Sequence, residues 1–183
     1  MQTKPSQPIL RDIELWPSPV LTADSVVRPD EVDGDVRAVV DELWAVLDAA
    51  PKIYHSISAP QIGLQIAIFV MDTERGGRKD GTRGAFINPE LVEATGEMRT
   101  MRECCLSFPT CSVPVNRNSS IKLKALGLSN EWYTVDADQF EARTMLHELD
   151  HLTGRTLYHA TPRLWRDNLD KQMRRALRMG QWR

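Results

Sequence analysis

The sequence lacks the features of a membrane, nucleic-acid-binding or disulfide-stabilised protein. Its longest purely apolar run, residues 66–71, is far shorter than the roughly 20 residues that a membrane-spanning helix needs. The formal net charge is only −2, so the whole chain has no basic footprint for nucleic acid. All three cysteines lie within residues 104–111, too close together to join distant parts of a domain. We therefore expect reduced thiols, which leaves a metal-binding or catalytic role open.

The N-terminal sequence does not have the pattern of a signal peptide. Charged residues occur there at Lys4, Arg11, Asp12 and Glu14. They interrupt the region where a signal peptide needs a continuous apolar stretch, and acidic residues also speak against a transit peptide. We therefore expect a cytoplasmic protein without membrane contact.

The chain length suits one compact core, so we expect a single domain over residues 1–183. Apolar residues at helical spacing predict helices from Val36 to before Pro51, from Asp136 or Asp138 to Gly154, and over 163–178. Short apolar or alternating segments predict strands at 66–71, 86–87, 121–125 and 132–135. A turn is expected at Asn88-Pro89, a polar loop over 76–84, and an irregular leader over 1–34.

Strands followed by helices favour an α+β fold. The helix that ends at Gly154 has apolar residues on several sides, which is typical of a buried helix. We expect mixed or antiparallel β-sheets packed around this central helix, with a further helix at the C-terminus. That last helix should bury a stripe formed by Trp165, Leu169, Met173 and Leu177.

The segment His147-Glu148-Leu149-Asp150-His151 carries the strongest chemical signal. Helical residues four apart lie one turn above each other, so both imidazoles can bind one metal ion with Glu148 beside it. The composition would produce this H-E-x-x-H pattern by chance with a probability of only about 0.5 %. The alternative is a pair of core histidines satisfied by the neighbouring backbone, which is costly beside a buried carboxylate.

A third metal ligand must come from upstream of this motif. No glutamate follows Glu148, and Leu157 occupies the position of the third histidine of a metzincin. Cys105 is the best candidate, because thiolates bind zinc and iron strongly. Adjacent strand residues point to opposite faces, so only one of Cys104 and Cys105 should reach the ion. We expect Cys104 and Cys111 to serve as small hydrophobic residues.

Three segments together resemble the peptide deformylase family. Residues 58–63 (SAPQIG) are similar to its GLAAPQIG segment, residues 103–107 (ECCLS) to its EGCLS segment, and residues 147–154 (HELDHLTG) to its HExDHLxG segment. They occur in the family's order and at its spacing. Weaker similarities extend from residues 17–21 to Arg117, whereas the C-terminal segment matches only as a helix.

The resemblance implies a hydrolase that removes the formyl group from N-formylmethionyl peptides or nascent chains and releases formate. It implies one divalent metal ion, Fe²⁺ as the native ion with Zn²⁺, Ni²⁺ or Co²⁺ as substitutes. The family pattern places this ion on Cys105, His147 and His151, with a fourth position open for water.

The remaining site residues also follow from the resemblance. Glu148 would take a proton from the attacking water and deliver it to the departing amine. The Gln61 amide and the backbone N–H of Leu106 would stabilise charge on the formyl oxygen. Glu103 and Arg117 would form an ion pair that holds the cysteine segment in place.

The chain departs from the family pattern at Tyr54, Ser56, Cys104 and Leu146. Tyr54 and Ser56 replace two glycines in the segment along which the substrate peptide runs, where we expect Ser56 and Ile57 to bind substrate. Side chains at these positions restrict the backbone and should narrow or re-aim the cleft. These departures concern substrate preference and rate more than the chemistry.

Two other functions stay open. The first is an amidohydrolase of the same mechanism with a different N-acyl substrate, and the second is a metal-bound homologue that binds formylated peptide or an inhibitor without turnover. Glu148 speaks against the second, because a pure binder needs no general base. The C-terminal segment 163–183 carries a net charge of +5, which predicts a weak ribosome contact or, more simply, a solvated basic face.

Overall fold

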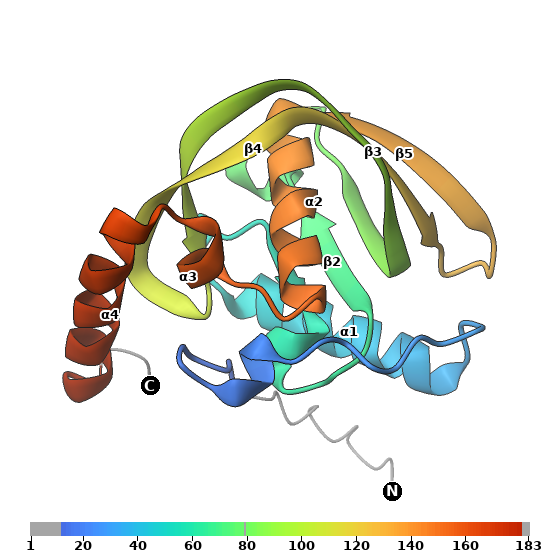
Figure 1. Ribbon diagram of the computed structural model, residues 1–183. Helices are drawn as coiled ribbons and strands as arrows, with labels where there is room; N and C mark the ends of the chain where they lie inside the picture. The colour runs from blue at the N-terminus through green and yellow to red at the C-terminus, as the bar shows by residue number, and fades with distance from the viewer. Residues whose placement is uncertain (1–11, 79, 181–183) are drawn as a thin grey trace, which may run out of the picture.

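The computed structural model describes residues 12–78 and 80–180 (Figure 1). Lys4 and Arg11 of the predicted leader, and Arg183 of the basic segment, lie outside these ranges. In chain order the elements, with η for a 3-10 helix, are η1 (Pro19–Thr22), α1 (Gly34–Ala49), β1 (Ser56–Ser58), η2 (Ala59–Ile62), β2 (Ile68–Asp72), η3 (Glu74–Gly76), β3 (Arg83–Cys105), β4 (Phe108–Leu126), β5 (Trp132–Asp138), α2 (Gln139–Leu152), α3 (Leu157–Ala160) and α4 (Arg163–Arg178).

The strands form one antiparallel sheet in the order β1-β2-β3-β4-β5. β3 and β4 are 23 and 19 residues long, and they arch over α2, which lies inside the curve of the sheet (Figure 1). The predicted α+β fold with a central buried helix is therefore confirmed. None of the helices within residues 12–78 and 80–180 is long and apolar enough to cross a membrane.

Helix α2 is buried because it presents different side chains to two sides. Met145 and Leu152 pack with Phe69, Phe86 and Leu123 of the sheet. The histidines of the motif face the end of β3 instead. The helix ends where predicted: Gly154 has a left-handed φ of 66°, and a Cβ there would lie only 2.7 Å from the Thr22 carbonyl oxygen.

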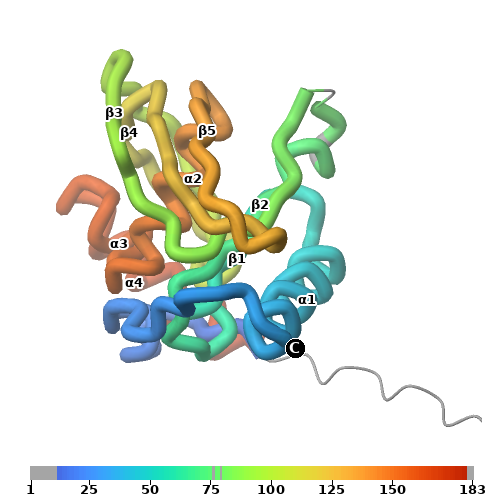
Figure 2. The backbone as a smooth tube through the Cα atoms, turned by 90° about the vertical axis from the view of Figure 1, so that its right-hand side faces the viewer, coloured from blue at the N-terminus to red at the C-terminus, as the bar shows by residue number. Residues whose placement is uncertain are grey.

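Helix α1 packs against β1 and β2 and thereby positions the segment around η2 (Figure 2). Asp33 rather than Asp35 caps it, since the Asp33 side chain accepts a hydrogen bond from the Val36 N–H. Its buried stripe joins Ile57 and Ile62 in one core cluster. This packing holds β1 and η2 against the rest of the molecule.

Several local predictions are wrong. Asn88-Pro89 is not a turn but an irregularity inside β3, where Asn88 has a φ of 47° and the register shifts between Ile87 and Glu90. The buried stripe of α4 consists of Leu169, Met173 and Ala176, whereas Leu177 is 44 % exposed. The packed face therefore continues from Met173 to the residue three positions later, not to the one four positions later. Most of β3 escaped prediction, because the side chains over 90–102 are exposed and show no apolar alternation, and of β4 only 121–125 was predicted.

Candidate active site

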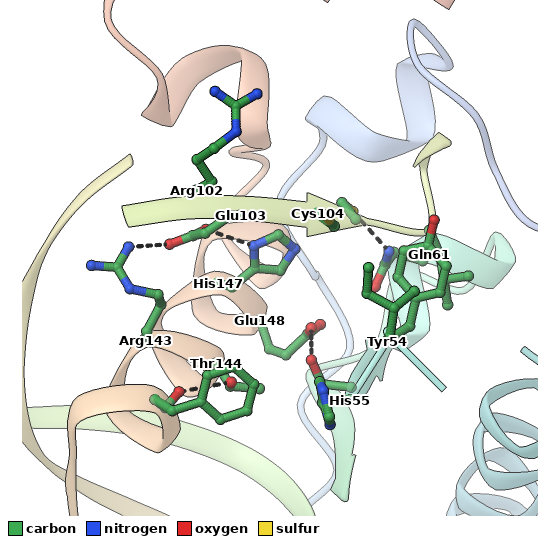
Figure 3. A pocket seen from close by; sticks show the side chains of 15 residues that line it. Tyr54, His55, Gln61, Arg102, Glu103, Cys104, Arg143, Thr144, His147 and Glu148 are labelled. Atoms are coloured by element: carbon green, nitrogen blue, oxygen red, sulfur yellow. Dashed lines mark hydrogen bonds and ion pairs between the residues drawn. The ribbon is translucent and has the colours of Figure 1, made fainter. Parts of the chain in front are cut away.

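A cavity of about 300 Å³ lies where β1, the end of β3 and one face of α2 meet (Figure 3). Six of the eight predicted site residues line it: Ser56, Gln61, Cys105, Leu106, His147 and Glu148. Residues that were not predicted as site residues also line it, among them His55, Arg102, Phe140, Arg143 and Thr144. Phe140 and Thr144 could have been found by sequence, because they share a helix face with His147 at one-turn spacing.

Cys105 and His147 line this cavity, and His151 is clustered with them but is buried outside the lining. Their potential ligand atoms are all within 4.8 Å of one another, and Cys105 Sγ is 3.2 Å from His151 Nε2. Helical spacing brings the two imidazoles together, and the end of β3 brings the thiol to them. One thiolate and two neutral imidazoles are a donor set that suits zinc or ferrous iron. Within the described part of the chain Cys104 is not a member of this group.

Glu103 orients the first histidine from behind. It precedes Cys105 by two residues on β3, so both side chains face α2. Its Oε2 lies 2.9 Å from His147 Nδ1 (Figure 3), which leaves His147 Nε2 for a metal ion. A carboxylate that holds a histidine in this way also selects the tautomer that the metal requires.

Two arginines surround the Glu103 carboxylate. Arg117 donates to both of its oxygens, at 2.7 and 3.0 Å, and Arg143 donates to Oε1 at 2.7 Å. Burial by itself raises the pKa of Glu103, but the hydrogen bonds from His147 and Arg117 outweigh it and hold the pKa well below its ordinary value. The predicted ion pair of Glu103 and Arg117 is confirmed. Arg143 was missed, because an arginine within a helix is usually a surface residue.

Glu148 is a buried carboxylate in which only one oxygen accepts a hydrogen bond from a described residue. Ser56 Oγ donates to Glu148 Oε1 at 2.5 Å, whereas no hydrogen-bond partner for Oε2 occurs among the residues that the structure describes. Burial raises the pKa of Glu148, although the charge of His147 and hydrogen bonds from serine side chains oppose the rise. A carboxylate with a raised pKa in a cavity accepts and returns a proton more readily than an exposed one.

Gln61 is held with its amide nitrogen beside the thiol. Ser58 donates to Gln61 Oε1 from its backbone N–H at 3.0 Å and from its hydroxyl at 3.1 Å. The NH₂ end therefore points the other way, and it donates to Cys105 Sγ at 3.3 Å and to Ser107 Oγ at 3.2 Å. Leu106 follows Cys105 directly and lines the cavity next to this group.

The two residues expected to bind substrate have different surroundings. The Ser56 side chain faces the cavity, whereas the Ile57 side chain is fully buried in the core beside α1. Any contact of Ile57 with a substrate would therefore involve its backbone. Neither Tyr54 nor Ser56 has a positive φ, so the backbone here does not need the conformational freedom of glycine. Both side chains nevertheless line the cavity.

The cysteines should differ in reactivity. Burial raises the pKa of the Cys111 thiol to about 11, whereas Cys104 is only half-buried and lines the cavity. At pH 8 a thiol with this pKa is ionised in only about one molecule in a thousand. Iodoacetamide followed by peptide mapping should therefore modify Cys104 well before Cys111 in the native protein. All three thiols should react after unfolding in guanidinium, and equal native rates would show that Cys111 is not protected.

The comparisons with known proteins agree with one another. A profile of the polypeptide deformylase family matches residues 10–166. A peptide deformylase of Agrobacterium fabrum is 32 % identical over 169 residues, 92 % of this chain and 97 % of that protein. One of Phenylobacterium zucineum is 33 % identical over 167 residues, 91 % and 96 % of the two chains. The crystal structure of a peptide deformylase of Ehrlichia chaffeensis shares the fold with a TM-score of 0.83 at 24 % identity, over 93 % of this chain and 98 % of that one.

Proposed function

Because this chain belongs to the polypeptide deformylase family, and so removes the N-formyl group from N-formylmethionyl peptides, we propose how its own residues perform that hydrolysis. The family depends on a metal ion, and Cys105, His147 and His151 form the candidate site for it. We propose that these three residues hold one divalent ion. The observation that carries the proposal is that a thiol and two imidazoles cluster beside a cavity lined by a buried carboxylate, one oxygen of which has no hydrogen-bond partner among the described residues.

The native ion is proposed to be Fe²⁺, with Zn²⁺, Ni²⁺ and Co²⁺ as substitutes. A site with one thiolate and two imidazoles accepts all of these ions. When bound, the ion supplies Lewis-acid chemistry that activates water and polarises the formyl carbonyl.

Glu148 is proposed as the general base and acid. Its open Oε2 accepts a proton from the water that attacks the formyl carbon, and the same proton then passes to the amine nitrogen as the C–N bond breaks. Gln61 Nε2 and the backbone N–H of Leu106 are proposed to donate hydrogen bonds to the formyl oxygen, where negative charge develops. Each such donor lowers the barrier by about 3 kcal/mol in comparable sites.

The peptide substrate is proposed to add to the outer edge of β1. This strand stands at one edge of the sheet, and extended peptides bind such edges through main-chain hydrogen bonds. Ser56 and the backbone of Ile57 would then contact the substrate.

We also propose that residues 1–183 form one catalytic domain and that it acts in the cytoplasm, where nascent chains carry formylmethionine.

Formate release from formyl-Met-Ala-Ser by protein of measured metal content tests this function. We expect stoichiometric metal and steady turnover, with no reaction on the acetyl-Met-Ala-Ser control. Turnover of the acetyl peptide instead would indicate an amidohydrolase for another N-acyl group. Metal and peptide binding without any turnover would indicate a binding protein and would overturn the hydrolase.

The iron-loaded protein should lose activity in air, whereas the zinc-loaded protein should keep it. Fe²⁺ is oxidised readily, and the Cys105 thiolate beside it becomes open to oxidation when the ion is lost. Parallel activity assays on iron- and zinc-loaded samples, with and without oxygen, measure this difference. If both samples lost activity in air at the same rate, oxidation of Fe²⁺ would not be the cause of the inactivation.

The basic face of α4 is proposed to contact ribosomal RNA weakly. Arg174, Arg175 and Arg178 are exposed, while Leu169 and Met173 of the same helix are buried, so charge reversal leaves the packing intact. Reversing all three to glutamate should reduce co-sedimentation with ribosomes at low salt by about tenfold, since each cation contributes to phosphate binding. Arg28→Glu, at an exposed site elsewhere, is the control. Unchanged or salt-insensitive co-sedimentation would contradict the contact.

A further inference from the structure

The short strand β1 presents two serine hydroxyls to the active site. Ser56 and Ser58 lie two residues apart, so their side chains leave the same face of the strand, and Ile57 between them points into the core. The Ser58 hydroxyl donates to Gln61 Oε1 at 3.1 Å, and the Ser56 hydroxyl donates to Glu148 Oε1 at 2.5 Å. The Ser58 hydroxyl thus holds Gln61, and the Ser56 hydroxyl holds Glu148.

The Glu148 carboxylate depends on such a contact for its orientation. The last torsion of a glutamate side chain has a broad energy profile, so the side chain by itself does not decide where its two oxygens point. Glu148 is only 1 % exposed, which leaves little room for water to orient the group. Among the residues that the structure describes, Oε2 has no partner, and the contact of Oε1 with Ser56 is therefore the main restraint on the carboxylate plane, with a lesser one from the Ser58 hydroxyl.

Resting on the proposed function, we infer that Ser56 is a positioning residue, which holds Glu148 Oε1 and thereby keeps Oε2 directed at the reacting water. The hydroxyl touches neither the water nor the formyl group in this role and acts only through Glu148. This changes the expectation that the sequence alone suggests for the position. A side chain that merely narrowed the cleft would raise kcat/KM when removed, whereas a positioning hydroxyl lowers kcat when removed.

Ser56→Ala and Ser56→Thr distinguish the two roles. Alanine should lower kcat for a formyl-Met peptide by about tenfold, the size expected for a lost hydrogen bond to a charged group, with KM changed less than about twofold. Threonine keeps the hydroxyl and should restore most of kcat. Thr161→Val is the matched control, because it removes another buried hydroxyl, bonded to the Pro114 carbonyl at 2.9 Å, outside the cavity. It should lower thermal stability without lowering kcat.

A double-mutant cycle tests whether Ser56 acts through Glu148. Ser56→Ala should cost about tenfold in the wild-type background but less than about twofold when Glu148 is already glutamine. Equal losses in both backgrounds, or an unchanged kcat in Ser56→Ala with full metal content, would overturn the inference. If the rate of Glu148→Gln falls below detection, the kcat values of Ser56→Ala and Ser56→Thr decide between the two roles of Ser56. If the wild type hydrolyses the peptide and the losses caused by Ser56→Ala and Glu148→Gln are additive, only the role of Ser56 is rejected. If the metal-loaded wild type does not hydrolyse the peptide, the proposed function is rejected as well.

Discussion

Glu148→Gln should lower kcat for formyl-Met-Ala-Ser by about a thousandfold, within the range that a positioned general base and acid contributes. Glutamine keeps the shape of glutamate, and its amide can still accept a hydrogen bond from Ser56. It cannot, however, accept the proton of the attacking water. Because Glu148 is not one of the three clustered ligands, the variant should keep its metal ion. Formate release and elemental analysis on the same sample measure both effects.

Glu141→Gln is the matched control for this substitution. Glu141 lies in the first turn of the same helix and bonds to Thr73 and the backbone of Thr82, away from the thiol and imidazoles. The Glu141→Gln variant should lose some stability and little activity. Near-normal turnover in Glu148→Gln with full metal content would remove Glu148 from its proposed role. Loss of the metal together with activity would instead make Glu148 a determinant of the metal site.

Cys105→Ala should abolish stoichiometric metal binding and, with it, hydrolysis. The thiol is one of only three clustered donor atoms in the described part of the chain, and two imidazoles alone hold a divalent ion much more weakly. Cys104→Ala should keep the metal, because Cys104 is not part of that cluster. Elemental analysis after dialysis, together with formate release, distinguishes the two variants.

The two cysteine variants control for each other, because each removes one sulfur from adjacent positions of the same strand. If Cys104→Ala lost the metal ion and Cys105→Ala kept it, Cys104 rather than Cys105 would be the ligand, and the register at the end of β3 would be wrong. Retention in both would show that the ion is held elsewhere. A circular dichroism melt of each apoprotein separates loss of the ion from loss of the fold.

Local patterns determined much of what the sequence predicted. The spacing of His147 and His151, the buried stripe of α1 and the glycine that ends α2 all depend on residues a few positions apart. Helical periodicity encodes such relations directly. The bounds of α4, Arg163–Arg178, were predicted for the same reason, although the packed face of its last turn was not.

Partners far apart in the chain were a different matter. The residues alone made Cys105 the best candidate for the third ligand, and the family resemblance added Gln61 as a site residue. The exposed stretch of β3 has no apolar alternation, so its length could not be predicted. The turn predicted at Asn88-Pro89 proved to be part of this strand.

By itself, the sequence determined that two imidazoles and a carboxylate share one buried helix, because an α-helix repeats every few residues whatever surrounds it. Only the tertiary structure decided which distant groups meet them. The arch of β3 and β4 brings Glu103 to His147 across 44 positions, and β1 brings Ser56 to Glu148 across 92. Arg143 pairs with Glu103 because both are enclosed between the sheet and α2. No local pattern encodes such contacts, since they depend on how the sheet curves around the helix and on which polar atoms burial leaves in need of a partner.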